Sequence, residues 1–262
     1  MKKLLLALTA AAAFSGSAFA ADLGPRTYSK APAPMMMAPS WTGFYIFGGA
    51  GGGLWAADSN VVTQPGNVAI SRDQRFGGSG WFGTAGIGYD WQVNPSWVVG
   101  ILADGQFGDI RGSINDPVVA FEGREKLRYS YAGGLRVGYL VAPNVLSYVN
   151  GGYSGSQWSG ASYSTLGAGG GPALFTTPSF TRNGWFIGGG VENNLNIFGI
   201  SSPGWFMKTE YRSAFYSRVT LPETFVGGGA TPDSVTFKPW TQTISTSLVY
   251  RFNWTGPVVA KY

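Results

Sequence analysis

From Trp41 onward, apolar and polar residues alternate with a period of two, which is the spacing of side chains on a half-buried β-strand. The clearest segment is 81–93, WFGTAGIGYDWQV, in which the aromatic residues fall on odd positions and the polar residues on even positions. The same division recurs in 126–140, 205–216 and 240–252. Weaker alternation occupies 41–55, 97–108, 146–157 and 184–195, and the phase of 41–55 and of 146–157 is ambiguous. The pattern therefore predicts eight strands over these segments.

The connections between these strands alternate between long and short. Segments 56–80, 109–125, 158–183 and 217–239 are long, whereas 94–96, 141–145 and 196–204 are shorter and contain turn residues such as Pro95 and Gly204. Short periplasmic turns and longer extracellular loops are typical of an outer-membrane barrel, whose tilted strands need roughly 9–11 residues to cross the bilayer. We therefore predict an all-β fold, an eight-stranded antiparallel up-and-down transmembrane β-barrel with short periplasmic turns and four long extracellular loops.

Period-two alternation also fits a soluble barrel of the lipocalin kind, so the face that meets lipid has to be assigned. Glycines and charged residues share one phase, and an eight-stranded barrel encloses an interior that side chains fill. With only 12% charged residues, a soluble barrel would expose an apolar band wider than a monomer tolerates in water. We therefore expect the aromatic face to point to lipid, with two interface belts formed from Trp81, Trp91, Trp97, Tyr129, Tyr139, Trp185, Trp205 and Trp240.

The opposite phase carries charges of both signs and is expected to line the lumen. Because an unpaired charge in a narrow interior costs several kilocalories per mole, we expect these residues to pair with one another. Two interpretations remain open: a purely structural polar core, or a gate whose ion pairs exchange partners to open a narrow conduit. The predicted network consists of Asp90, Asp104, Arg128, Arg136, Glu192, Lys208, Glu210, Arg212 and Arg251.

Composition excludes several kinds of catalytic site. The chain contains no Cys and no His, so it cannot build a zinc site from those residues, a Ser-His-Asp triad, a Cys-His dyad or a His-ligated haem. We predict no enzymatic activity, no cofactor and no metal site. The net charge is 18 − 13 = +5, which falls to 16 − 13 = +3 without Lys2 and Lys3 and predicts no nucleic-acid partner.

The N-terminus has the features of an export signal. Lys2 and Lys3 precede an apolar stretch from Leu4 to Phe14, and Ala18-Phe19-Ala20 fits a small-x-small cleavage site. We predict a signal peptide over 1–20, cut between Ala20 and Ala21, then a Pro-rich periplasmic linker over 21–40. The barrel domain is expected to occupy 41–262, with its last strand at about 240–252 and a tail over 253–262.

Five short segments in this order resemble those of small alphaproteobacterial outer-membrane barrel proteins. The segments are WTGFYIFGG from Trp41, GWFIGGGVE from Gly184, WFMKTEYRSAFY from Trp205, LVYRF ending at Phe252, and the terminal GPVVAKY. The resemblance covers 41–262 and is to the major outer-membrane proteins of roughly 25 to 31 kilodaltons, a porin family of OmpA-like and opacity-like eight-stranded barrels. It implies a location in the cell outer membrane of a Gram-negative bacterium.

The resemblance also suggests partners and a function. Phe252 looks like the C-terminal signal read by the barrel-assembly machinery, although Tyr262 at the end of the chain competes for that role. Membrane lipid and lipopolysaccharide are the other expected partners, and we expect a monomer. The leading hypothesis is a structural surface protein that contributes to envelope integrity, with at most narrow, non-specific permeability. The alternatives are a small diffusion porin for small hydrophilic solutes, and a surface adhesin or haem-type ligand receptor acting through the long loops.

Overall fold

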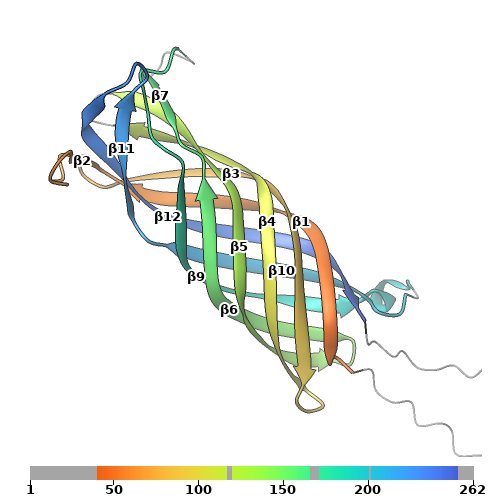
Figure 1. Ribbon diagram of the computed structural model, residues 1–262. Helices are drawn as coiled ribbons and strands as arrows, with labels where there is room; N and C mark the ends of the chain where they lie inside the picture. Colours follow the sequence, from red (N-terminus) through yellow and green to blue (C-terminus); the bar gives the residue numbers. More distant parts are fainter. Residues whose placement is uncertain (1–39, 117–119, 166–170, 201, 253–262) are drawn as a thin grey trace, which may run out of the picture. The chain divides into compact units, whose positions relative to one another are not determined.

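The computed structural model describes residues 40–116, 120–165, 171–200 and 202–252. Eight long strands form a closed antiparallel ring in the order β1-β3-β4-β5-β6-β9-β10-β12, and β12 pairs with β1 to complete it (Figure 1). The prediction of an eight-stranded barrel is therefore confirmed. The ring strands are β1 (Gly43–Ser59), β3 (Gln74–Gln92), β4 (Trp97–Asp116), β5 (Phe121–Ala142), β6 (Val145–Trp158), β9 (Phe180–Asn194), β10 (Trp205–Tyr216) and β12 (Ala230–Arg251).

The predicted signal peptide, its cleavage site at Ala20 and Ala21, the Pro-rich linker up to residue 39, and the tail with Tyr262 lie outside the described residues. Phe252 is the last described residue, and its backbone N–H donates to the carbonyl oxygen of Phe44 at 3.1 Å. No helix in the described part of the chain is long and apolar enough to cross a membrane.

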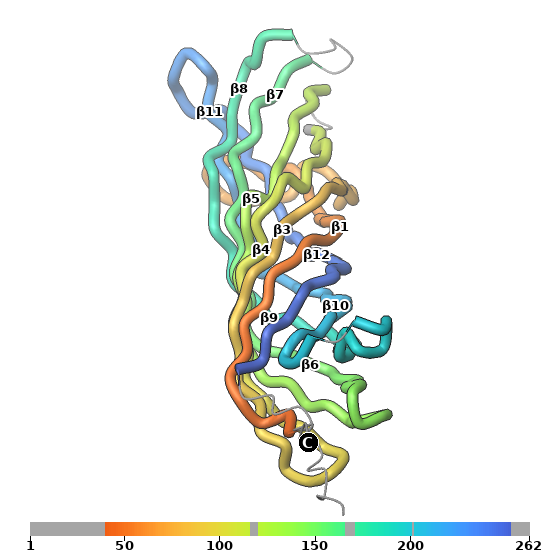
Figure 2. The backbone as a smooth tube through the Cα atoms, turned by 90° about the vertical axis from the view of Figure 1, so that its right-hand side faces the viewer, coloured from red at the N-terminus to blue at the C-terminus, as the bar shows by residue number. Residues whose placement is uncertain are grey.

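Several strands continue well beyond the predicted boundaries at the end of the barrel that carries the long connections. β4 extends to Asp116 instead of 108, and β12 begins at Ala230 instead of 240. The short strands β2 (Val61–Thr63), β7 (Ser162–Thr165), β8 (Phe175–Thr176) and β11 (Val219–Phe225) join the sheet at this end (Figures 1 and 2). Part of each long connection is thus paired in the sheet, which the predicted strand boundaries did not include.

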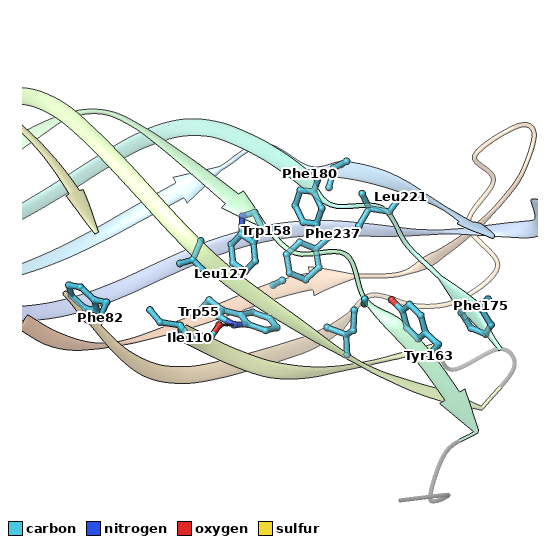
Figure 3. Packing of buried hydrophobic residues seen from close by; sticks show 14 residues of the cluster. Trp55, Phe82, Ile110, Leu127, Trp158, Tyr163, Phe175, Phe180, Leu221 and Phe237 are labelled. Atoms are coloured by element: carbon cyan, nitrogen blue, oxygen red, sulfur yellow. Dashed lines mark hydrogen bonds between the residues drawn. The ribbon is translucent and has the colours of Figure 1, made fainter. Parts of the chain in front are cut away.

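A buried aromatic cluster explains this extension. Trp55, Trp158 and Phe237 meet edge to face, with ring centroids 5.3–5.6 Å apart (Figure 3). Tyr163 on β7 and Leu221 on β11 belong to the same cluster, so the short strands help to cover its apolar surface. Burial of this surface offers enough stabilisation to hold the connections as strands rather than as hydrated loops.

The outer surface carries two aromatic belts at a constant spacing. Five strands present aromatic residues ten positions apart on their outward face: Trp81 and Trp91, Trp97 and Phe107, Tyr129 and Tyr139, Trp205 and Phe215, Trp240 and Tyr250. At about 3.3 Å per residue and a tilt of about 40°, ten residues rise by roughly 25 Å, which is the height of the apolar band of a membrane barrel. Between the two belts, the outward positions of the described strands carry no charged residue. This band fits the hydrocarbon core of a bilayer.

Each residue predicted for the belts lies on the outer surface. Seven of the eight are exposed, from 41% for Trp205 to 80% for Trp81. Trp240 is partly buried because the Arg75 guanidinium lies over its ring, 4.7 Å from the centroid. Trp185 stacks on Phe215 at 4.6 Å, and Trp97 meets Tyr139 at 5.3 Å.

Not all of the large aromatic residues face lipid. In the segment of ambiguous phase, Tyr45, Phe47 and Trp55 point into the lumen and are at most 7% exposed. Glycines on neighbouring strands leave the necessary space: a Cβ atom on Gly86 would lie 2.5 Å from Cζ of Phe47 and 2.7 Å from Cβ of Asp104. Glycine and large rings therefore interdigitate within the narrow interior.

We predict that Gly86→Ala destabilises the barrel by about 1–3 kcal/mol, because the added methyl group has no room between Phe47 and the β4 backbone. The matched control is Gly83→Ala on the same strand, where a Cβ atom would meet only carbonyl oxygens at 3.8 and 3.9 Å, with an expected change within about 0.5 kcal/mol. Urea unfolding in lipid vesicles measures both changes. Equal stability of the two variants would contradict the interdigitated packing.

Candidate functional site

The lumen holds two groups of buried charges, each with two acidic and two basic side chains. The first, which we call the Asp90 group, contains Asp90, Arg136, Glu192 and Arg251, whose side chains are 0–3% exposed. The second, the Asp104 group, contains Asp104, Lys208, Glu210 and Arg212, whose side chains are 1–7% exposed. Each group has a formal charge of zero, so neither leaves an excess charge in the low-dielectric interior.

The Asp90 group forms a closed ring of alternating charges. Arg136 donates from Nε to Asp90 Oδ1 at 2.8 Å and from Nη1 to Glu192 Oε2 at 3.0 Å, and its Nη2 also contacts Asp90. Arg251 donates from Nε to Glu192 Oε1 at 2.9 Å and from Nη2 to Asp90 Oδ2 at 2.8 Å. The four residues come from β3, β5, β9 and β12, so the ring ties four strands together across the lumen.

The Asp104 group is arranged around Arg212. This guanidinium binds Asp104 through two parallel hydrogen bonds, from Nη1 at 2.8 Å and from Nη2 at 2.7 Å, and Nη2 also donates to Glu210 Oε1 at 2.8 Å. The other oxygen of Glu210 accepts from the Tyr148 hydroxyl at 2.8 Å and from Asn150 Nδ2 at 3.0 Å, and lies 3.7 Å from Lys208 Nζ. Residues of β4, β6 and β10 are thereby joined.

Every cation of the two groups also lies against the face of a buried ring. Lys208 Nζ lies 3.3 Å from the centroid of Phe47, and the guanidinium of Arg212 lies 4.5 Å from that of Phe186. Arg136 and Arg251 lie over Tyr45, at 4.6 and 4.9 Å. Cation–π attraction is strongest in desolvated surroundings, so the rings stabilise the charges while filling the space around them. The site is therefore a packed layer of ion pairs and rings, and its acidic groups all face cations.

The structure brings together eight of the nine residues predicted for the lumen network. Arg128 is the exception: it is exposed, whereas Leu127 beside it is buried. The cause is a β-bulge, because the pairing of β5 with both neighbouring strands shifts register at this position. A bulge inserts one residue and changes the phase of alternation, which places Arg128 and Tyr129 on the outer surface together.

Sequence reasoning missed the polar and aromatic partners of the network. Tyr45 and Tyr148 lie in the two segments whose phase is ambiguous, and Asn150 follows Tyr148 on the same inward face. Glycines on neighbouring strands are the signal that pointed to them, since a Cβ atom on Gly88, Gly190 or Gly188 would meet Tyr45, Tyr148 or Asn150, respectively. Within the described residues, no three His, Cys, Asp or Glu side chains gather into a group suited to a metal ion.

Comparison with known proteins identifies the family. Residues 6–252 match the family model described as the outer membrane protein beta-barrel domain. The chain belongs to this family. Its members reside in the outer membrane, and we assign this barrel to the same location. The 31 kDa outer-membrane immunogenic protein of Brucella melitensis biotype 1 is 30% identical over 215 residues, covering 80% of this chain and 85% of the relative. The protein of the same name from Brucella suis biovar 1 matches equally well.

Solved structures resemble this outer-membrane barrel in fold. OprG of Pseudomonas aeruginosa is 10% identical, with a TM-score of 0.46, over 80% of this chain and 97% of OprG. Neisserial surface protein A is 14% identical, with a TM-score of 0.38, over 80% of this chain and 98% of that protein. The Escherichia coli outer-membrane protease OmpT is 10% identical, with a TM-score of 0.43, over 84% of this chain and all of OmpT (100%).

We predict that Arg212→Met lowers the free energy of unfolding by about 3–5 kcal/mol, because it leaves Asp104 buried without its bidentate partner. The double variant Asp104→Leu/Arg212→Met removes both charges and should lose at least about 1 kcal/mol less than the sum of the two single variants. Arg128→Met is the control and should change stability by no more than about 0.5 kcal/mol, since Arg128 is exposed. Additive losses in the cycle would show that the pair is not coupled.

Proposed function

We propose that this outer-membrane barrel is a non-catalytic structural protein that contributes to envelope integrity and keeps its lumen sealed. The observation that carries the proposal is the pair of neutral, fully packed charge groups, whose acidic and basic side chains are all at most 7% exposed. A solute would have to separate several desolvated ion pairs to pass. Each separation leaves uncompensated buried charges, at a cost of several kcal/mol.

The same contacts favour a mechanical role for the network. The Asp90 group joins β3, β5, β9 and β12, and the Asp104 group joins β4, β10 and, through Tyr148, β6. Seven of the eight ring strands therefore contribute a side chain to one or other of the two hydrogen-bonded groups. Contacts of this kind across the lumen oppose any flattening of the barrel cross-section. This property suits a protein that has to remain closed in the membrane.

An enzymatic function is disfavoured on chemical grounds. The chain has no His, and the carboxylates of the Asp90 and Asp104 groups are engaged by arginine and lysine rather than presented to a substrate. The diffusion-porin alternative is disfavoured because porins that form an aqueous channel use about 16–18 strands, and an eight-stranded interior is filled by side chains.

Liposome swelling tests the sealed lumen. Proteoliposomes containing the refolded chain should swell in an isotonic arabinose solution no faster than protein-free liposomes, whereas a porin of about 16 strands should give rapid swelling. Swelling that slows as the sugar becomes larger would support the diffusion-porin alternative and would refute the sealed barrel.

Deletion of the gene in its native host tests the envelope role. Cells lacking the protein should become more sensitive to detergent and to osmotic shock, and the wild-type gene should restore resistance. Unchanged sensitivity, together with lost binding to a host surface, would favour the loop-receptor alternative instead.

A further inference from the structure

A cluster of basic side chains lies on the outer wall of the barrel, next to one aromatic belt. We define the basic patch as Arg111 on β4 with Lys126 and Arg128 on β5. Arg111 and Lys126 are direct partners across the two strands, and Arg128 precedes the belt residue Tyr129. Phe107 pairs with Tyr129, so both rings of this part of the belt lie immediately on the membrane side of the patch. The patch therefore occupies the level of the lipid headgroups.

The patch carries an excess of positive charge. Asp109 is its one acidic partner: it contacts Arg111 and lies 3.1 Å from Lys126 Nζ. Two cations thus share one carboxylate, and none of the described ion pairs includes Arg128. Elsewhere on the rim the described ion pairs are one to one, with Arg75 3.0 Å from Asp58 and Arg218 3.6 Å from Asp73. The β4–β5 side of the rim is therefore suited to receive an anion.

The β-bulge creates this arrangement. Register shifts at 107–110 on β4 and at 127–129 on β5 put Arg128 on the outer surface beside Tyr129, although strict alternation would have placed it in the lumen. The side chains of the patch remain accessible: Arg111 is 60% exposed and Lys126 is 32% exposed. A bulge that re-aims a charged side chain to a sheet surface is a common feature of binding sites.

A polar hollow continues the same surface away from the membrane. It has a volume of about 690 Å³ and is lined by Ser113, Ser162, Ser164, Arg124 and Glu122, among others. Ser113 pairs with Arg124, two positions beyond the pair formed by Arg111 and Lys126, so the hollow directly adjoins the patch. Hydroxyl groups that both donate and accept, beside one cation and one anion, suit the hydroxyl groups of a sugar.

We propose that the basic patch and the hollow together bind the headgroup of a phosphorylated glycolipid of the outer leaflet. The cations bind its phosphate groups through charge-assisted hydrogen bonds, and the hollow receives the sugar attached beyond them. Phe107 and Tyr129, which are 61% and 42% exposed, lie where the acyl chains of the same lipid begin. The aromatic rings, the cations and the serine hydroxyl groups thus follow one another along the surface, away from the membrane. This order matches the acyl chains, phosphates and sugar of a membrane lipid better than it matches a soluble phosphate. The inference does not depend on whether the lumen is sealed.

Native mass spectrometry of the full chain in detergent tests the proposal, with lipid A carrying both phosphates as the probe. The variant Arg111→Gln/Lys126→Gln/Arg128→Gln should bind this lipid about tenfold more weakly or worse, because each cation near a membrane surface contributes a several-fold increase in affinity for anionic lipid. Dephosphorylated lipid A should bind the wild type as weakly as it binds the variant. Retained folding is checked by the shift in electrophoretic mobility on heating.

The matched control removes three cations from the neighbouring part of the rim, on and next to β3 and β12, as Arg72→Gln/Arg75→Gln/Lys238→Gln. All three side chains are exposed, and the variant changes the net charge by the same amount as the patch variant does. Its affinity for lipid A should fall less than about threefold. If both triple variants lost the same affinity for lipid A, the effect would come from the net charge of the protein, and the proposed site would be wrong. Displacement of lipid A by an equal concentration of inorganic phosphate would overturn the lipid as its occupant.

A second variant tests the hollow separately. Ser113→Ala/Ser162→Ala/Ser164→Ala should weaken binding of lipopolysaccharide that carries core sugars about threefold or more, because hydroxyl hydrogen bonds are lost, and should leave lipid A binding unchanged. Unchanged binding of both ligands would remove the hollow from the site and limit the proposal to phosphate recognition by the patch.

Discussion

Buried charges in a narrow barrel must be neutralised inside it, and this constraint organises the rest of the structure. Eight of the charged side chains that face the lumen form two groups whose charges cancel. Bidentate and bridging geometry requires that side chains from non-adjacent strands meet inside the lumen, as Arg212 on β10 meets Asp104 on β4, four strands away in the ring. Inward glycines make that approach possible, and aromatic rings fill the remaining space. The sealed lumen and the structural role that we propose for the barrel both rest on these neutral, buried groups.

The outer surface obeys the complementary rule. Its strands carry no charge on their outward positions over the ten residues between the aromatic belts, and each charged residue on the described outer wall lies beyond the belt at the long-loop end. Lipid is the solvent for the first region, and headgroups and water are the solvent for the second. The basic patch beside the β4–β5 bulge lies at the boundary between these two regions. Its position and charge therefore favour a lipid headgroup as its ligand.

Alternation in the sequence was sufficient to predict the strand number, the closed topology and eight of the nine lumen charges, because the period of two is fixed by backbone geometry. It failed where geometry departs from that period. Arg128 was misplaced because a bulge changes the phase, and nothing in the local sequence marks the inserted residue. Tyr45 and Phe47 were not assigned to the lumen because glycine and aromatic residues share both phases of β1. The extended sheet at the long-loop end depends on contacts between segments as distant as Trp55 and Phe237, which no local pattern reveals.

The osmotic water permeability of proteoliposomes tests the sealed lumen most directly, because water is the smallest solute that any residual conduit would pass. Stopped-flow light scattering of vesicles containing the folded chain should give the same shrinkage rate as protein-free vesicles of equal size. A rate that rises in proportion to the amount of folded protein would contradict the account, since it would require a continuous hydrated path through the two charge groups.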